Sequence, residues 1–178
     1  MPLLPLAVFT AAASAAASLG GIPIPKRNAC QLVSVPTVST IVGSPATIQS
    51  QPGSFQISPG FTVRQVAISL CSYTFGTPSD NLTPTVSITY FVTATRLGAS
   101  TEFKRIKSLL GTSGWRRFTH IGDSAVGRLN PRGGADFLTL YGNQFLQISL
   151  AATNVAAPLA KVKRAATRAA AAAWPRRN

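Results

Sequence analysis

The chain has 178 residues, of which 17 are Lys or Arg and only four are Asp or Glu, so its net charge at pH 7 is +13. This charge makes polyanions the expected partners, whether nucleic acid, anionic lipid or an acidic protein surface. One His, two Cys and four scattered carboxylates supply little material for acid–base or metal chemistry, which argues against an enzyme, a metal site and a cofactor. The length predicts one domain with appendages.

Residues 1–29 are predicted to form an apolar N-terminal arm and a linker. The arm, residues 1–21, has an apolar run followed by small residues and so is similar to a secretory signal, but no Lys or Arg precedes the run. The run also falls short of the ~20 apolar residues of a membrane span. We predict an arm that packs on another surface, and leave open a membrane-associated segment or an uncleaved leader. The packing residues are predicted to be Leu3, Leu4, Leu6, Val8 and Phe9.

Residues 30–157 are predicted to form an all-β domain. The clearest strand is Thr85–Thr95, in which apolar residues alternate with Ser and Thr, as in a strand with one buried and one solvated face. Turn signals about every 8–12 residues separate further β-rich runs, which favours an antiparallel β-sandwich, jelly-roll-like or immunoglobulin-like. The further runs are 31–42, 46–50, 54–58, 61–75 and 115–121.

One short helix is predicted inside this domain, over Glu102–Leu110. Apolar residues line one of its faces and basic residues the other. Ser100 or Thr101 would cap its start and Gly111 its end. Residues 122–135, rich in Gly, Asn and Pro, are predicted to form a loop.

Residues 136–150 are predicted to form a hairpin. A two-residue Gly142-Asn143 turn would be conventional, but it would set Leu138 opposite Gln147. If one face of the sheet is buried, apolar residues should oppose one another. We therefore predict the longer loop Gly142–Gln144, with Tyr141 opposite Phe145.

Cys30 and Cys71 are the two thiols of the chain. Because Cys71 lies in an apolar strand, we expect a buried free thiol. A bridge between the two cysteines is the alternative.

Residues 158–178 are predicted to form a basic, Ala-rich helical tail. Alanine favours the helix, but an isolated helix of this length is marginal in water, so we expect it to order mainly on a partner. The tail residues predicted to bind nucleic acid or an acidic partner are Lys161, Lys163, Arg164, Arg168, Arg176 and Arg177.

A second basic cluster precedes the tail. It is interpreted either as a solvated surface or as a groove for phosphate or an acidic neighbour. Trp115 stands beside it and would be half-buried, or would stack on a base. The cluster comprises Lys104, Arg105, Lys107, Arg116 and Arg117.

The composition of the tail resembles the termini of linker histones and of small basic virion proteins, which neutralise polyphosphate without reading sequence. A small β-domain with adhesive arms at both ends also resembles small capsid and minor capsid proteins. That resemblance implies a structural virion protein whose partners are other capsid subunits and whose tail meets the genome. Two alternatives stay open: a nucleic-acid-binding ribonucleoprotein component, and an exported or membrane-attached β-domain.

Overall fold

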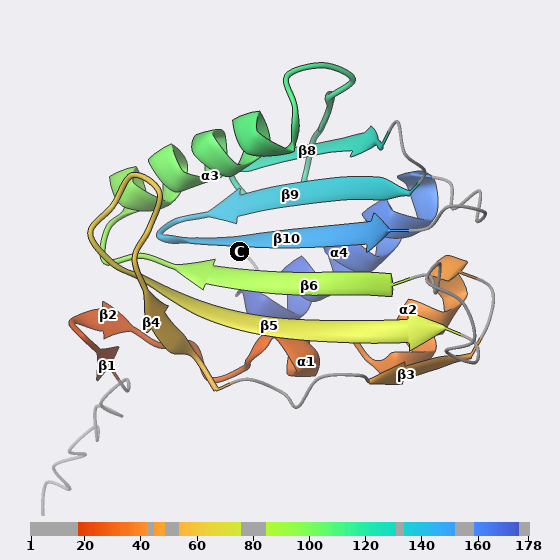
Figure 1. Cartoon of the computed structure of the whole chain (residues 1–178), viewed down its shortest axis with the longest axis horizontal. Helices are drawn as coiled ribbons and strands as arrows, with labels where there is room; N and C mark the ends of the chain where they lie inside the picture. Colours follow the sequence, from red (N-terminus) through yellow and green to blue (C-terminus); the bar gives the residue numbers. More distant parts are fainter. Residues whose placement is uncertain are drawn as a thin grey trace, which may run out of the picture.

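The structure is a computed structural model and describes residues 18–42, 45–48, 54–75, 85–130, 134–151 and 159–174. These residues form a mostly β protein with one eight-stranded antiparallel sheet, a two-stranded ribbon and four helices (Figure 1). The ribbon pairs β1 (Ser18–Leu19) with β2 (Ile22–Pro23).

The large sheet has the strand order β3-β5-β6-β10-β9-β8-β7, and β4 also pairs with β5. Its strands are β3 (Ala46–Ile48), β4 (Gln56–Ser58), β5 (Val66–Phe75), β6 (Thr85–Val92), β7 (Arg116–Phe118), β8 (Ser124–Leu129), β9 (Ala135–Tyr141) and β10 (Gln144–Ala151).

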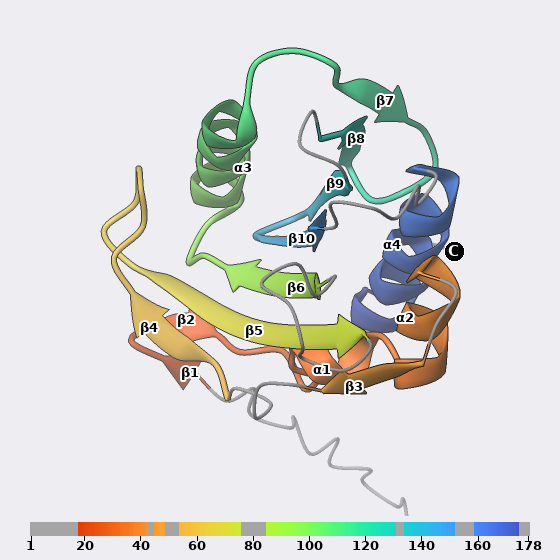
Figure 2. The same ribbon diagram turned by 45° about the vertical axis from the view of Figure 1, so that its right-hand side comes forward.

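Helices cover both faces of this sheet (Figure 2). One face packs against α1 (Ala29–Leu32), α2 (Val35–Val42) and α4 (Leu159–Ala173), and the other against α3 (Arg96–Leu110). The prediction of an all-β fold is therefore confirmed only in its coarser form: the protein is predominantly β. The second, facing sheet that a sandwich requires is not found among the described residues, because helices occupy that place.

The predicted strand over residues 31–42 is wrong, since this stretch contains the end of α1 and all of α2. Asn28 begins α1 through a capping box with Gln31. Pro36 falls in the first turn of α2, where a proline ring is tolerated. The β-branched residues Val38 and Ile41 are buried against the sheet, and this packing overrides their strand propensity.

Strand β6 confirms most of the clearest sequence prediction, Thr85–Thr95, but it ends at Val92, three residues earlier than predicted. Its four alternating apolar residues, Val86, Ile88, Tyr90 and Val92, are fully buried. Phe91, which breaks the alternation, lies on the opposite face and stacks on Phe145 with ring centroids 4.4 Å apart. Both faces of the strand are therefore partly covered.

The predicted hairpin register is wrong. The strands pair Tyr141 with Gln144 and Leu138 with Gln147, so the turn is the conventional two-residue Gly142-Asn143. Gly142 has φ +58°, as the first central residue of a type II′ turn requires. The prediction failed because it assumed one buried face, whereas Leu138 is buried on the α3 side and its neighbour Phe137 on the α4 side.

Helix α3 begins six residues earlier than predicted. The Thr95 side chain, rather than Ser100 or Thr101, caps it by accepting a hydrogen bond from the Gly98 N–H at 3.0 Å. Gly111 ends the helix as predicted.

Residues 122–135 include a strand, β8, and so are not the predicted loop throughout. The Gly, Asn and Pro residues led to the loop prediction, whereas Arg128 of this strand is buried. Its charge is paired with Asp136 on the neighbouring strand β9 at 3.1 Å.

Helix α4 forms within the region where a helical tail was predicted, but it packs on the sheet of its own chain. Val162, Ala166 and Ala169 are fully buried against β8, β9 and β10. Trp174, just after the helix, stacks on Tyr141 with ring centroids 5.2 Å apart. The expectation that the helix orders mainly on a partner is therefore wrong, because its small apolar stripe already has a surface to cover.

Cys30 and Cys71 form a disulfide that joins α1 to β5, with Cα atoms 5.1 Å apart. The expected free thiol is wrong. Cys71 is indeed fully buried, but the helix that begins at Ala29, which was not foreseen, carries Cys30 to it.

Candidate basic groove

A hollow of about 240 Å³ lies between α2 and α4. We call it the basic groove. Thr37 and Thr40 of α2 line it on one side, and on the other stand four residues of α4: Lys161, Arg164, Ala165 and Arg168. The three cations are spaced by three and four residues, as are side chains on one side of a helix.

The position of the three cations is fixed by the packing of α4. The opposite side of the helix is buried, as described above, and Ala165 beside the cations is also buried. Beyond the helix end, the Trp174 Nε1–H donates a hydrogen bond to Gln144 Oε1 at 3.1 Å. The cations therefore stand on a helix that is anchored at its middle and its end.

Arg27 extends the row of cations. Its Nη1 donates to the carbonyl of Ala172 at 3.5 Å, and position 172 follows Arg168 by one helical turn. From Lys161 to position 172 the rise of 1.5 Å per residue gives a row of about 17 Å. A cation beside the last carbonyls of α4 also complements the negative end of the helix.

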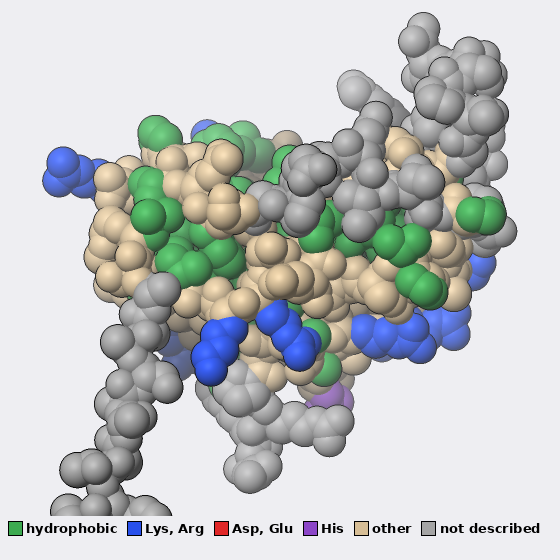
Figure 3. Space-filling model, turned by 90° about the horizontal axis from the view of Figure 1, so that it is seen from below, with side chains coloured by type: hydrophobic (Ala, Val, Ile, Leu, Met, Phe, Trp, Pro, Cys, Tyr) green, Lys and Arg blue, Asp and Glu red, His purple; other side chains and the backbone are tan. Residues whose placement is uncertain are grey.

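The three described carboxylates are engaged elsewhere. Asp123 forms an ion pair with Arg96, and Asp136 with Arg128. Glu102 accepts hydrogen bonds from the backbone of the loop that precedes β5. The view from the side of α1 and β3 shows several Lys and Arg side chains, and no Asp or Glu side chain is visible among the described residues of this face (Figure 3).

The groove therefore offers guanidinium and ammonium donors beside hydroxyl groups. Arg164 and Arg168 are exposed, and guanidinium groups bind phosphate and carboxylate through paired hydrogen bonds. Thr40 is exposed and Thr37 is partly exposed, although Thr40 donates its hydroxyl hydrogen to the Thr37 carbonyl. Such a surface suits a chain of anions better than a neutral ligand.

One of the remaining predicted tail residues does not join the groove. Lys163 lies on another flank of α4, with its Nζ 4.9 Å from the ring centroid of Phe118. Arg176 and Arg177 lie outside the described residues, as do the predicted arm residues Leu3, Leu4, Leu6, Val8 and Phe9.

The second basic cluster is not a single surface. Lys104 and Arg105 are exposed on α3, which covers the sheet face opposite α4. Arg116 and Arg117 are adjacent in the edge strand β7, so their side chains point to opposite faces.

Trp115 is half-buried, which agrees with the structural interpretation of this residue. The Arg128 guanidinium lies 5.0 Å and the Lys107 Nζ 5.9 Å from its ring centroid. The indole N–H donates to the Gly111 carbonyl. These intramolecular contacts hold the indole ring without a nucleic-acid base stacked on it.

Arg27, Thr37 and Thr40 were missed as site residues. Arg27 was read as part of a linker, and the two threonines as part of a strand. The spacing of three between the threonines was the available signal, but it becomes meaningful only when residues 35–42 are read as a helix.

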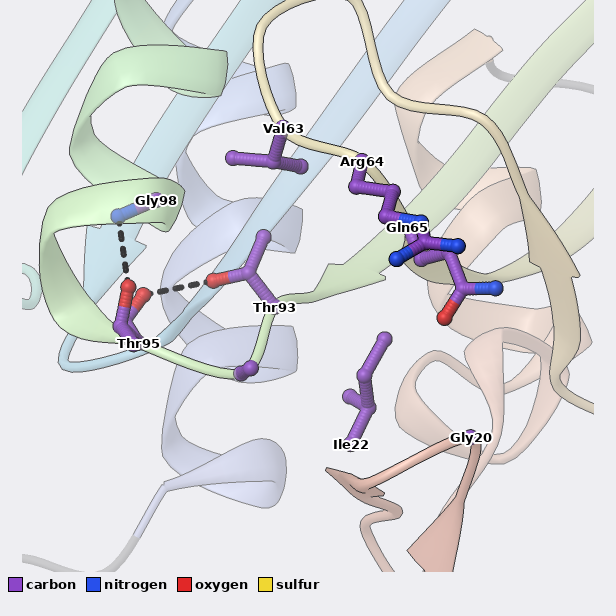
Figure 4. Close-up of a pocket in the computed structure, with 9 residues that line it drawn as sticks. Gly20, Ile22, Val63, Arg64, Gln65, Thr93, Thr95 and Gly98 are labelled. Atoms are coloured by element: carbon purple, nitrogen blue, oxygen red, sulfur yellow. Dashed lines mark hydrogen bonds between the residues drawn. The ribbon is translucent and has the colours of Figure 1, made fainter.

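A second hollow, of about 200 Å³, lies at the start of α3 (Figure 4). We call it the α3 pocket. It is lined by the β1–β2 ribbon, the loop before β5, the segment that joins β6 to α3 and the first turn of α3. The residues are Gly20, Ile22, Val63, Arg64, Gln65, Thr93, Ala94, Thr95 and Gly98.

Comparison of the chain with protein-family models, with curated proteins and with solved structures found no match. Within the described ranges, no helix has the length and apolar character needed to cross a membrane. The same ranges contain no cluster of three or more His, Cys, Asp or Glu side chains suited to a metal ion.

Proposed function

We propose that the protein is a non-catalytic binding domain that attaches to a polyanion through the basic groove. One observation carries this proposal: Lys161, Arg164 and Arg168 stand in a row on an anchored helix, and Arg27 continues that row. Holding like charges side by side is costly unless an anion offsets their repulsion. The described carboxylates, which could have done so, serve other parts of the fold.

The proposal sets the expected salt dependence. If the four cations each neutralise one phosphate of a single-stranded oligonucleotide, log K should fall with log salt at a slope of about −3, from roughly −0.7 per phosphate. If instead the oligonucleotide were bound by the net charge of the whole surface, no small set of substitutions would abolish its binding.

The test is fluorescence anisotropy with labelled oligo-dT and, separately, competition by inorganic polyphosphate. We expect Arg164→Gln/Arg168→Gln to weaken binding at least tenfold and to make the salt slope shallower by about 1.4. Lys104→Gln/Arg105→Gln is the matched control, since it removes two exposed charges from α3. Equal losses in both variants would contradict a groove and leave only net charge.

The disulfide favours an oxidising setting for this function, because such bonds persist in exported proteins and on cell or virion surfaces and are rare in the cytosol. We therefore prefer the exported or membrane-attached domain to the ribonucleoprotein component. Intact-mass measurement of protein from its native source, with and without thiol alkylation, tests this. A full-length chain with two alkylated thiols would contradict it.

A structural virion protein remains the second candidate. A disulfide and a groove for a genome are compatible with it. This candidate is less favoured because it requires α4 to pack under a neighbouring subunit, whereas α4 packs on the sheet of its own chain. Sizing of the native material tests this candidate, since a virion subunit would be recovered in a megadalton particle.

A further inference from the structure

We propose that the α3 pocket is a second binding site, distinct from the basic groove, and that it takes the free C-terminal carboxylate of a peptide whose last residue is apolar. The pocket places one guanidinium group, that of Arg64, beside the apolar side chains of Ile22, Val63 and Ala94. These are the two chemistries that a terminal apolar residue carries: a side chain to bury and a single negative charge.

The wall of the pocket is held in place by hydrogen bonds within the fold. Thr93 Oγ1 donates to the Thr95 carbonyl at 2.7 Å, and Thr95 Oγ1 accepts from the Gly98 N–H at 3.0 Å (Figure 4). The facing loop is fixed by Glu102, which accepts hydrogen bonds from the Thr62 hydroxyl at 3.0 Å and the Val63 N–H at 2.9 Å. Both sides of the pocket therefore stay in place without a ligand.

Arg64 and Gln65 supply the polar groups for a ligand. Both side chains extend from the loop into the space above Ile22 and Gly20 (Figure 4), and both are exposed. A guanidinium binds a carboxylate through two parallel hydrogen bonds.

The segments that line the pocket also carry exposed apolar side chains. Three large hydrophobic side chains are exposed on the segments that line it: Leu19 at 39%, Phe61 at 65% and Leu97 at 78%. Leu19 adjoins Gly20 and Leu97 adjoins Gly98 in the chain. In this proposal, these apolar side chains contact the residues before the peptide terminus.

The size and charge of the pocket separate it from the basic groove. Drug-sized ligands occupy pockets of roughly 300–1,000 Å³, so a hollow of about 200 Å³ suits a single amino-acid residue. It also presents one cation, whereas the basic groove presents a row. One charge matches a terminal carboxylate, and a row matches a polymer.

The experiment is an NMR titration of the ¹⁵N-labelled full chain with two N-acetylated tetrapeptides that end in Leu, one with a free carboxylate and one amidated. The acid should bind about tenfold more tightly than the amide and shift the amide signals of residues 63–65 and 93–98. Arg64→Gln should remove the difference between acid and amide, and Leu97→Ser should weaken both peptides.

Two controls separate this proposal from the polyanion site. Arg105→Gln removes one positive charge, as Arg64→Gln does, but from a part of α3 away from the pocket. It should leave peptide binding unchanged. Arg164→Gln/Arg168→Gln should impair oligonucleotide binding alone. The pocket assignment would be overturned if neither peptide binds, or if the acid and the amide bind wild type with equal affinity. It would also be overturned if Arg64→Gln still prefers the acid, or if the shifted signals are confined to α2 and α4. None of these outcomes would contradict the basic groove.

Discussion

Replacement of Trp174 by Ala tests whether α4 is part of the folded domain. The indole is 7% exposed, stacks on Tyr141 at an interplanar angle of 20°, and donates to Gln144. Truncating a buried Trp to Ala costs about 3–5 kcal/mol from lost burial and the cavity that remains. Tyr90 still donates to Gln144 in the variant, so that acceptor is not left unpaired and adds little to the loss.

A loss of this size is a large part of the roughly 5–15 kcal/mol that stabilises a typical domain. It should lower the Tm by about 6–20 °C for a chain of this length and reduce the urea midpoint, both followed by far-UV circular dichroism. Leu129→Ala is the matched control, because Leu129 is 61% exposed and should change stability by less than about 0.5 kcal/mol. If Trp174→Ala behaves like the control, α4 is an appended tail and the packing argument fails.

Three further predictions concern buried groups. Reduction of the Cys30–Cys71 bridge, or Cys30→Ser/Cys71→Ser, should cost about 4 kcal/mol, from the entropy of a loop of 41 residues, measured by urea unfolding. Asp136→Ala should cost about 3–5 kcal/mol because it leaves the buried Arg128 charge unpaired, whereas Arg128→Met/Asp136→Ala should cost less than that single change. Burial raises the pKa of Tyr90, so its neutral form stabilises the fold below about pH 10, and this contribution should be lost as the pH rises further.

Each of these predictions has an outcome that contradicts it. The first fails if wild-type protein unfolds at the same urea concentration with and without reductant. The ion-pair argument fails if the double variant is as unstable as Asp136→Ala. For Tyr90, the loss of stability above pH 10 should be smaller in Tyr90→Phe than in wild type, and parallel pH profiles would show that another group is responsible.

Strand β6 and helix α4 could be predicted because each shows its period without help from the rest of the chain. The alternation of residues 85–92 and the Ala-rich run after Pro158 are local signals. The local sequence could not show which other element packs against each face of a strand or helix. The hairpin register depended on whether the second face of β9 was covered, and α3, from another part of the chain, covers it.

Strand β8 and helix α2 were missed for a related reason. Arg128 is polar in the sequence and buried in the fold, because Asp136 on the next strand pairs with its charge. Six of residues 35–42 are β-branched, yet the segment forms a helix whose burial outweighs strand propensity. In both cases a contact with another element produces a structure opposite to the one that the local composition predicts.

The same distinction bears on the basic groove. The sequence identified Lys161, Arg164 and Arg168, but Thr37, Thr40 and Arg27 come from more than 120 residues earlier and could join them only through the fold. This changes what the cations can do. A tail that orders on its partner loses conformational entropy on binding, whereas cations on a helix already packed against a sheet pay less of that cost and hold a set spacing. The groove should therefore favour anionic polymers whose charges match a row of about 17 Å over those that merely carry the same net charge.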